Sequence, residues 1–591
     1  MTGSHARTSA RELIETVVDP GTWESWDEPV AVTTEDPGYR ADLERARART
    51  GLDESVLTGE GRVDGRRVAL VACEFRFLAG SIGVASGERL VRAVERATRE
   101  RLPLLAAPAS GGTRMQEGTI AFLQMVKVAA AITEHRAAGL PYLVYLRHPT
   151  TGGVLASWGS LGHVTAAEPG ALIGFLGPRV HEALYGEEFP AGVQVAENLL
   201  AHGLVDAVLS PSQLAVVAAR VLRVLCADGA GPAGGRGPAA PEPVVPAPGS
   251  AVPDTAVPGP AAPEPAIPGP AAGPWAGAPG AGPAGGPGRG AAPAPTRDAP
   301  AGDPAGAPAG GQAPPAEVSI RRSREPGRPG VRALLRAAAE DVTPLSGTGA
   351  GEHDPGLLLA LARVGGTPCV VLGHDRHPAE GPGQALGPAG LRTARRGMGI
   401  AAELGLPLLT VVDTAGAALS REAEEGGLAG EIARCLADMV TLPAPTLCLL
   451  LGQGAGGAAL ALLPADRVIA ARHAWLSPLP PEGASAILYR TTDRAYETAD
   501  RQGVRSADLF AHGIVDRIVE EDDDPGGDRD GARGRAPGRD PGPAAGAASA
   551  GGFLARLGGV LGAELAVLRA EDPAERLAAR RARHRGMGLP G

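Results

Sequence analysis

Two pairs of adjacent glycines are the residues whose spacing most directly suggests chemistry. Gly152-Gly153 lies in the stretch "PTTGGVLASWGSLG" and Gly456-Gly457 lies in "GQGAGGAALAL", each between an apolar run and a run of small residues. Glycine adopts positive φ without strain and lets another atom approach the backbone closely. Successive amides at the start of a helix can point at one oxygen and stabilise negative charge that develops on it, as in an oxyanion hole. The alternative interpretation is that each pair only permits tight packing of a strand against a helix.

The glycine pairs occupy equivalent places in a duplicated sequence. The segment "LPLL" at 102–105 recurs at 406–409, which is 304 positions later. At the same spacing "SGG" (110–112) falls on "TAG" (414–416), and the first glycine pair falls on the second. Farther along, "AHGLVD" is matched by "AHGIVD". These matches predict a duplicated fold, and the recurrence of the turn in both copies favours a functional role over packing alone.

The elements around each pair predict an α/β domain. In the first copy "RVALVACEF" (67–75) is typical of a buried strand and "GERLVRAVERATRE" (87–100) of an amphipathic helix. A strand in "LPLLAAPA", a long helix over 113–139 and a strand over 140–148 follow. Such alternation indicates a largely parallel sheet with helices. Each glycine turn would then lie between the carboxyl end of a strand and the next helix, where α/β sheets place their ligands.

Composition divides the 591 residues into folded blocks and spacers. The segment 228–326 is nearly all Pro, Ala and Gly, and 522–550 is an acidic stretch rich in Gly and Pro. Neither segment can bury enough apolar surface to offset the entropy of ordering, so both are predicted to be disordered linkers. The expected domains are therefore an N-terminal domain at 1–227 and a C-terminal domain at 327–521. Helical spacing of Leu and Val predicts a C-terminal helix over 551–591.

Charge and cysteine usage narrow the class of partner. The formal net charge is −10, which argues against nucleic acid because phosphate binding needs a basic surface. The five cysteines show no CxxC spacing, so small buried hydrophobes in a reducing compartment are expected rather than zinc ligands or disulfides, and no metal is expected. No run was expected to approach the length of a membrane span. These features predict a cytoplasmic protein with no membrane partner.

Several motifs resemble those of a known family. The first block is similar to the β subunit of bacterial acetyl-CoA carboxylase carboxyltransferase through "FRFLAGSIGVASGE", "SGGTRMQEG" and "GLPYLVYLRHPTTGGVLASWG". The second block resembles the α subunit through "DTAGA", "GQGAGGAALAL" and "PPEGASAIL". The resemblance implies two crotonase-like domains fused in one chain and joined by the Pro/Ala/Gly linker. In this family two related domains from different subunits form one active site, which implies a homo-oligomer of at least two chains.

The resemblance also implies catalytic roles for the glycine pairs. Gly152 and Gly153 would hold the thioester oxygen of an acyl-CoA as it becomes an enolate. Gly456 and Gly457, with the Ala458 amide, would hold the ureido oxygen of carboxybiotin. The carboxyl group would move from biotin to the acyl α-carbon, and the departing biotin nitrogen would accept the α-proton. No side-chain base is then required.

Four further residues are expected to contact substrate by the same resemblance. Gly111, Gly112 and Arg114 in "SGGTR" would line the CoA side, with Arg114 a candidate for a phosphate or substrate contact. The alternative for Arg114 is a solvated arginine at a helix start. Gly416 in "DTAGA" would line the opposite face.

The lysine content bears on where biotin is attached. Lys127, in "FLQMVKVAAA", is the only lysine of the chain, and it lies in a helical stretch rather than in the Met-Lys-Met hairpin to which biotin is attached. Carboxybiotin must therefore come in trans, from a biotin carboxylase and a biotin carboxyl carrier protein. Lys127 itself is expected on a helix surface, with a CoA-phosphate contact as the alternative.

Three functions remain open at this point. The first is carboxyl transfer to acetyl-CoA or another short acyl-CoA, giving malonyl-CoA for fatty acid or polyketide precursor synthesis. The second is a malonate decarboxylase-type βγ fusion, and the third is a non-catalytic acyl-CoA-binding scaffold. The chain departs from the family by lacking a four-cysteine zinc ribbon, by "GHDRH" (373–377) where "GHQKG" is usual, and by Ala415 where the α pattern has proline. The motifs "SGGTRMQEG…TTGGV" and "PPEGASAIL" favour the carboxyltransferase over the decarboxylase. The retained glycine pairs count against the scaffold, and the change at "GHDRH" counts for it.

Overall fold

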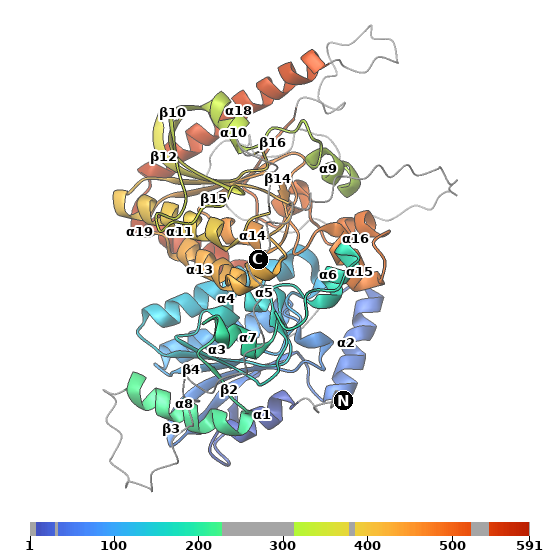
Figure 1. The fold of residues 1–591 in the computed structure, drawn as a ribbon, viewed down its shortest axis with the longest axis vertical. Coiled ribbons are helices and arrows are strands. Elements are labelled where there is room, and N and C mark those ends of the chain that lie inside the picture. The colour runs from blue at the N-terminus through green and yellow to red at the C-terminus, as the bar shows by residue number, and fades with distance from the viewer. Residues whose placement is uncertain (1–7, 30–33, 227–312, 378–384, 522–542, 590–591) are drawn as a thin grey trace, which may run out of the picture. The chain divides into compact units, whose positions relative to one another are not determined.

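The computed structural model describes two α/β halves and a C-terminal helical segment (Figure 1). They belong to one compact unit. The described residues are 8–29, 34–226, 313–377, 385–521 and 543–589. Most of the two predicted linkers lies outside these residues. Two boundaries are corrected, because helix α9 (Ala316–Ser323) lies within the predicted first linker and helix α18 (Pro543–Ala570) begins within the second.

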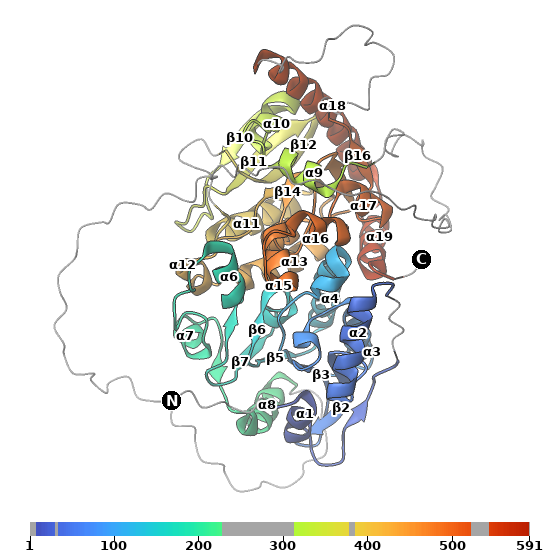
Figure 2. The same cartoon turned by 90° about the vertical axis from the view of Figure 1, so that its right-hand side faces the viewer.

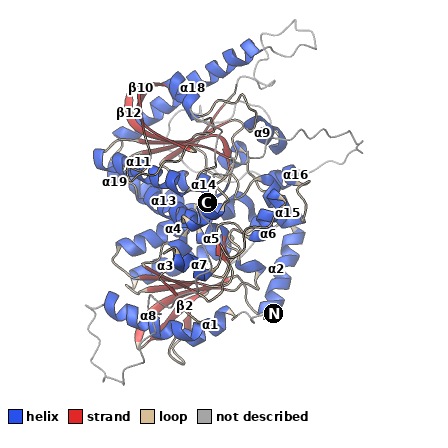
Figure 3. Ribbon diagram, in the orientation of Figure 1, coloured by secondary structure: helices blue, strands red, loops and turns tan. Residues whose placement is uncertain are grey.

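The N-terminal half contains a seven-stranded sheet in the order β1-β2-β3-β4-β5-β7-β9. Figure 3 shows its strands in red, with blue helices above and below them. Strands β1 to β3 pair antiparallel and all later neighbours pair parallel, so the largely parallel sheet is confirmed. A separate parallel pair, β6 with β8, flanks the first glycine pair. The strands are β1 (Glu24–Ser25), β2 (Val56–Val63), β3 (Arg66–Cys73), β4 (Leu104–Ala107), β5 (Tyr142–Leu146), β6 (Thr150–Thr151), β7 (Val164–Ala167), β8 (Ile173–Gly174) and β9 (Ala207–Val208).

The C-terminal half repeats this topology. Its sheet has the order β10-β11-β12-β13-β14-β15-β16, again antiparallel for the first three strands and parallel beyond them. The shared order confirms the duplicated fold. The strands are β10 (Ala339–Leu345), β11 (Leu357–Val364), β12 (Thr367–His374), β13 (Leu408–Thr414), β14 (Thr446–Gly454), β15 (Arg467–Ala471) and β16 (Arg517–Val519).

The helices of the N-terminal half confirm the two predicted long helices, as α3 and α4. The helix expected after the first glycine pair is much shorter, because α5 has only four residues. The helices are α1 (Ala10–Val17), α2 (Pro37–Thr50), η1 (Leu78–Gly80), α3 (Val84–Arg99), η2 (Met115–Glu117), α4 (Gly118–Ala137), α5 (Gly152–Leu155), η3 (Trp158–Ser160), α6 (Pro178–Tyr185), α7 (Ala196–Ala201) and α8 (Pro211–Leu225).

The C-terminal segment contains two helices where one was predicted. They separate just before Asp572, whose side chain accepts hydrogen bonds from the first-turn amides of the second helix and so caps it. The helices after α9 are α10 (Val331–Ala338), α11 (Pro388–Leu404), α12 (Arg421–Glu425), α13 (Leu428–Thr441), α14 (Gly456–Leu462), α15 (Pro481–Tyr489), α16 (Ala495–Arg501), α17 (Ser506–Ala511), α18 and α19 (Pro573–Gly586).

The two halves share one hydrophobic core. Helices α4 and α13, at corresponding positions of the duplication, pack against each other where the halves meet (Figure 1). The cluster of buried apolar side chains continues from one half into the other. The Thr119 hydroxyl on α4 donates to the carbonyl of Leu476 at 3.0 Å, which adds a direct hydrogen bond between the halves. This packing brings the two glycine turns together.

One stretch within α18, Gly551–Ala570, is apolar and long enough to cross a membrane by length and composition alone, with a mean hydropathy of 1.4. The expectation that no run reaches that length is therefore wrong. One face of the helix is buried against the C-terminal half, and Leu557, Leu561 and Leu565 lie in the core. Burial in protein accounts for the apolar composition of this face.

Residues 573–589 form a C-terminal strap that contacts both halves (Figure 2). The guanidinium of Arg580 is fully buried and lies 2.6 Å from Asp466 in the C-terminal half. Arg585 lies 2.7 Å from Glu88 on α3 of the N-terminal half. A carboxylate in each half thus anchors the same helix through one of its arginines.

Lys127 lies beneath the strap rather than on a surface. Its side chain is fully buried, with Nζ 2.6 Å from the Glu88 carboxylate, and its ammonium also donates to the carbonyl of Met587 at 3.5 Å. Both expectations for this lysine, a surface position and a CoA-phosphate contact, are therefore wrong. Its partner is 39 positions away in the chain, so the helix pattern alone did not reveal the pair.

Candidate active site

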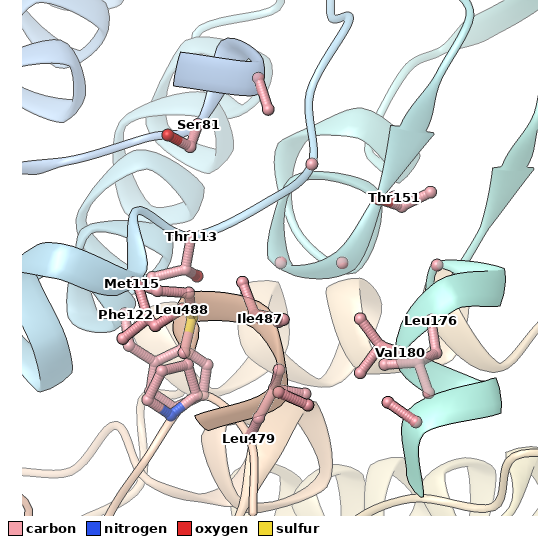
Figure 4. Close-up of a pocket in the computed structure, with 18 of the residues that line it drawn as sticks. Ser81, Thr113, Met115, Phe122, Thr151, Leu176, Val180, Leu479, Ile487 and Leu488 are labelled. Atoms are coloured by element: carbon pink, nitrogen blue, oxygen red, sulfur yellow. The ribbon is translucent and has the colours of Figure 1, made fainter. Parts of the chain in front are cut away.

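A cavity of about 1060 Å³ lies where the two halves meet. The N-terminal half contributes the first glycine pair and the loop around Thr113, and the C-terminal half contributes Gly457 and part of α15. Figure 4 shows Leu479 and Ile487 of the C-terminal half lying between Thr113 on one side and Val180 on the other. The lining is mostly apolar. Among the described residues that line it, the ionisable ones are Glu182 and Arg490.

The first glycine turn lies at the wall of this cavity. Gly152 has φ of 64°, and its amide donates to the carbonyl of Phe175 at 3.0 Å. Gly153 is the second residue of α5, where an amide has no acceptor within the helix. Both glycines line the cavity. The expectation that both amides point at one oxygen is therefore wrong: the Gly152 amide is engaged within the turn, and Gly153 lines the cavity as the second residue of α5.

The second turn has the same construction. Gly456 has φ of 65°, and its amide donates to the carbonyl of Ser477 at 2.9 Å. Gly457 and Ala458 are the second and third residues of α14, so their amides also lack an acceptor within the helix. Gly457 lines the cavity, whereas Ala458 is fully buried. The Gly456 amide is again engaged within the chain, and Gly457 is the residue of this turn that lines the cavity.

The second turn is covered more closely than the first. A Cβ atom added at Gly457 would lie 2.9 Å from Ile432 and 3.0 Å from the ring of Phe175. A Cβ atom added at Gly153 would lie 3.1 Å from the Thr113 hydroxyl and 3.2 Å from Met125. Both glycines are thus closely approached by side chains, and the neighbours of Gly457 are the bulkier.

The other predicted glycines lie around these turns in different ways. Gly111 lines the cavity. Gly112 has φ of 101°, and a Cβ atom there would lie 3.1 Å from the Gly153 amide nitrogen, so it packs directly behind the first turn. Gly416 has φ of 138° and its amide donates to the Thr414 hydroxyl at 3.1 Å, outside the cavity lining.

Arg114 has a structural environment rather than a ligand-facing one. Its side chain is fully buried, and Nη1 lies 2.8 Å from a carboxylate oxygen of Glu54. Burial alone would lower the pKa of Arg114, but the Glu54 charge beside it raises that pKa above its usual value. The predicted substrate contact and the alternative of a solvated arginine are therefore both corrected. The pair fixes the loop that carries Gly111 and Gly112.

The divergent "GHDRH" segment is buried over Gly373, His374 and Asp375, whereas His377 is exposed. Burial lowers the pKa of His374 to about 4, with the Val411 and Ala458 backbone opposing the shift. The imidazole is therefore neutral at neutral pH. Arg376 lies 3.1 Å from Asp413, so the segment forms an internal ion pair.

Three residues that line or brace the cavity were not predicted from the sequence: Phe175, Ile487 and Glu424. Phe175 lies in "AEPGALIGFLGPRV", a stretch that carried the resemblance without suggesting a role for this residue. Glu424 lies on α12 of the other half, 249 positions away, and contacts Phe175. No local pattern signals a contact over that distance.

Comparison with known proteins gives matches over both halves. Residues 3–211 match the carboxyl transferase domain, and residues 316–533 match the acetyl co-enzyme A carboxylase carboxyltransferase-like family. The chain is 52% identical over 586 residues to the probable biotin-dependent acyl-coenzyme A carboxylase beta3 subunit of Mycobacterium tuberculosis (strain ATCC 25618 / H37Rv), covering 99% of each chain. The chain belongs to the carboxyltransferase family of biotin-dependent acyl-CoA carboxylases.

Further relatives agree with this assignment. The carboxyltransferase is 38% identical over 600 residues to acetyl-coenzyme A carboxylase carboxyl transferase subunits beta/alpha of Parafrankia sp. (strain EAN1pec), covering all of this chain and 87% of the relative. The solved structure of transcarboxylase 12S aligns with 87% of each chain at 18% identity and a TM-score of 0.32, too low for a residue-level correspondence. Family membership and the repeated sheet order together identify two crotonase-like domains. The carboxyltransferase therefore takes its carboxyl group from carboxybiotin on a partner protein.

Proposed function

We propose that this carboxyltransferase transfers the carboxyl group from carboxybiotin, held on a separate carrier protein, to acetyl-CoA or another short acyl-CoA. The product with acetyl-CoA is malonyl-CoA. One observation carries the proposal: Gly153 and Gly457, each the second residue of an equivalent helix, line one cavity. The names of relatives such as the Parafrankia protein support acetyl-CoA as the acceptor.

The first turn suits a thioester whose oxygen gains charge. The Gly153 amide would donate to this oxygen as the α-carbon loses its proton and the enolate forms. A preorganised donor of this kind lowers the barrier because its dipole is already aligned when charge develops. The apolar lining, including Phe122 and Leu176, excludes water and strengthens the interaction.

The second turn suits the neutral ureido group of the carboxyl donor. Gly457 and Ala458 offer uncharged backbone donors beside apolar neighbours, Ile432 and Phe175 among them. This donor set fits a carbonyl oxygen on an uncharged ring. Bound there, carboxybiotin supplies the carboxyl group and a nitrogen able to accept the α-proton. The chain's own part is to bind and orient the two reactants.

A transfer assay tests the proposal. The purified chain would be mixed with a biotinylated carrier charged by biotin carboxylase, ATP and labelled bicarbonate, and with acetyl-, propionyl-, butyryl- and palmitoyl-CoA in turn. We expect label in the short acyl-CoA products, with the highest kcat/KM for acetyl-CoA. A preference for palmitoyl-CoA would contradict the short-chain assignment. Decarboxylation of malonate on an acyl carrier without biotin would contradict carboxyl transfer itself.

The proposal extends to partners and assembly. The chain would act in the cytoplasm with biotin carboxylase and the carrier protein, as a homo-oligomer of at least two chains. One chain already supplies both glycine turns to the cavity, so a second copy is not needed to complete it. Light scattering at micromolar concentration tests the assembly, and a monomer would contradict it.

A further inference from the structure

One carboxylate crosses from the C-terminal half to the N-terminal half beside the cavity. Glu424, on α12, accepts hydrogen bonds from the Phe175 amide at 2.8 and 3.1 Å. It also accepts one from the side-chain amide of Gln194 at 2.6 Å. Burial raises the pKa of the Glu424 carboxyl, and the hydrogen bonds from Gln194 and Phe175 oppose that shift. The partners that hold this carboxylate are thus neutral amides of the opposite half.

Phe175 connects this carboxylate to both glycine turns. Its carbonyl accepts the Gly152 amide at 3.0 Å, and that hydrogen bond fixes the turn whose next residue, Gly153, lines the cavity. Its ring lies against Gly457, 3.0 Å from where a Cβ atom would stand. The residue that Glu424 holds therefore contacts the first turn through its backbone and the second through its side chain.

Glu425, the next residue of α12, provides a contrast. It also reaches the N-terminal half, where it accepts a hydrogen bond from Asn198 at 3.2 Å and lies 3.7 Å from His202. These partners lie on or beside α7. Among the contacts of Glu425 with described residues none is to either glycine turn, whereas Glu424 holds the residue that touches both.

We propose that Glu424 is a positioning residue that aligns the two glycine turns across the interface through Phe175. The inference rests on the proposed function, because alignment matters only if both turns act in one reaction. Hydrogen bonds to an ionised acceptor are shorter and stronger than neutral ones. Removing the carboxylate frees the Phe175 peptide to shift, and the Gly153 amide moves with it. Misplacement by about 1 Å costs as much as about 100-fold in rate.

The kinetic test compares Glu424→Ala with Glu425→Ala in the transfer assay. For Glu424→Ala we expect kcat to fall by about 10- to 100-fold, with KM for the acyl-CoA changed by less than about threefold, because donor alignment acts in the transition state. Glu424→Gln keeps one oxygen acceptor and recovers part of kcat. Glu425→Ala stays within about threefold of wild type in both constants. Equal losses in the two alanine variants, or a rise in KM alone, would overturn the proposal.

A second measurement does not depend on catalysis. Hydrogen exchange of the Gly152 amide, followed by mass spectrometry on the full chain without substrate, reports whether the turn is held. We expect exchange to accelerate by about tenfold in Glu424→Ala and in part in Glu424→Gln, and to stay unchanged in Glu425→Ala. Unchanged protection in both Glu424 variants would overturn the alignment role. If wild type transfers no carboxyl group, the proposed function fails while the exchange result still decides whether Glu424 holds the turn.

Discussion

Equivalent helices of the two halves are joined by ion pairs of opposite polarity. In the N-terminal half Glu88 on α3 lies 2.6 Å from Lys127 on α4. At positions 304 residues later, Arg392 on α11 lies 3.0 Å from Glu431 on α13. The duplication therefore retains the place of the pair while the signs are exchanged.

The difference has a local cause in the strap. Arg585 of the strap binds Glu88, the acidic residue of the N-terminal pair. Glu88 therefore contacts a cation of its own half, Lys127, and a cation of the C-terminal segment. An arginine at position 88, as at position 392, would repel Arg585. The glycine turns show the complementary pattern: their backbones match, but their side-chain neighbours differ. The backbone geometry is common to both halves, and the supporting contacts are specific to each.

The largest expected effect comes from giving the ion pair of one half the charges found in the other half. Glu88→Arg would place a fourth cation beside Lys127, Arg585 and Arg92, and loss of a buried ion-pair partner costs about 3–5 kcal/mol. Urea unfolding would measure this loss. Adding Lys127→Glu should restore the helix pair and recover part of the free energy, with the remainder due to repulsion of Arg585. The matched change Arg392→Glu should cost less, because the Arg392 side chain is 32% exposed. An equal cost in both halves would contradict the role of the strap.

The next effect tests whether the two turns are chemically equivalent. Proline is tolerated in the first turn of a helix but has no N–H. Gly153→Pro should therefore lower kcat by about 100- to 1000-fold, the loss typical of one oxyanion donor. Gly457→Pro should give a loss of similar size in the same assay. Circular dichroism checks that both variants fold. Loss at one turn alone would show that only one half acts on the reacting atoms.

A smaller effect, on stability, should distinguish the side chains that surround the two turns. Gly457→Ala adds a methyl group against Ile432 and the ring of Phe175, so we expect overpacking of about 1–3 kcal/mol. Gly153→Ala meets the hydroxyl of Thr113 and the flexible side chain of Met125, and should cost less. Thermal unfolding ranks the two. Phe175→Leu should partly rescue Gly457→Ala and leave Gly153→Ala unchanged. A reversed order would contradict the difference in covering.

The smallest effect is the pH dependence of the strap contact. Burial raises the pKa of the Glu88 carboxyl, but hydrogen bonds from Arg585 and Lys127 outweigh burial. The pKa is therefore lowered from 4.5 to about 2. A carboxyl whose pKa is lower in the folded state contributes stability above its unfolded value, and this stability is lost as pH falls from about 4.5 towards about 2. Glu88→Gln should reduce this loss of unfolding free energy at low pH by about 1 kcal/mol. The effect is small because the cluster is partly open to solvent. Parallel unfolding curves for wild type and variant across this pH range would rule the contribution out.

Much of the fold could be predicted because its signals are local. Strands such as β3 and β5 and helices such as α3 follow from apolar spacing, and the duplication follows from the repeated segments. The glycine turns followed from the same repeats. The family resemblance supplied their roles. Contacts between distant segments gave no such signal.

The residues placed wrongly illustrate that limit. Arg114 and Lys127 are cations expected near solvent or ligand, yet each is buried against a carboxylate far along the chain. The equivalent of Arg114 in the C-terminal half is Ala418, so even the internal repeat gave no guide to its role. Glu424 and Phe175 meet only because the two halves pack together. Side-chain partners of this kind are set by tertiary packing, which composition and periodicity do not record.

Because Lys127 is buried, its chemical labelling can report on the opening of the folded chain. Reagents that acylate ε-amines have a single possible side-chain target, and it is shielded by the C-terminal strap and Glu88. The rate at which Lys127 becomes labelled would therefore measure how often the strap lifts from the N-terminal half, without an introduced probe. Attachment through lysine side chains, for imaging or immobilisation, would in turn select molecules in which that contact has opened.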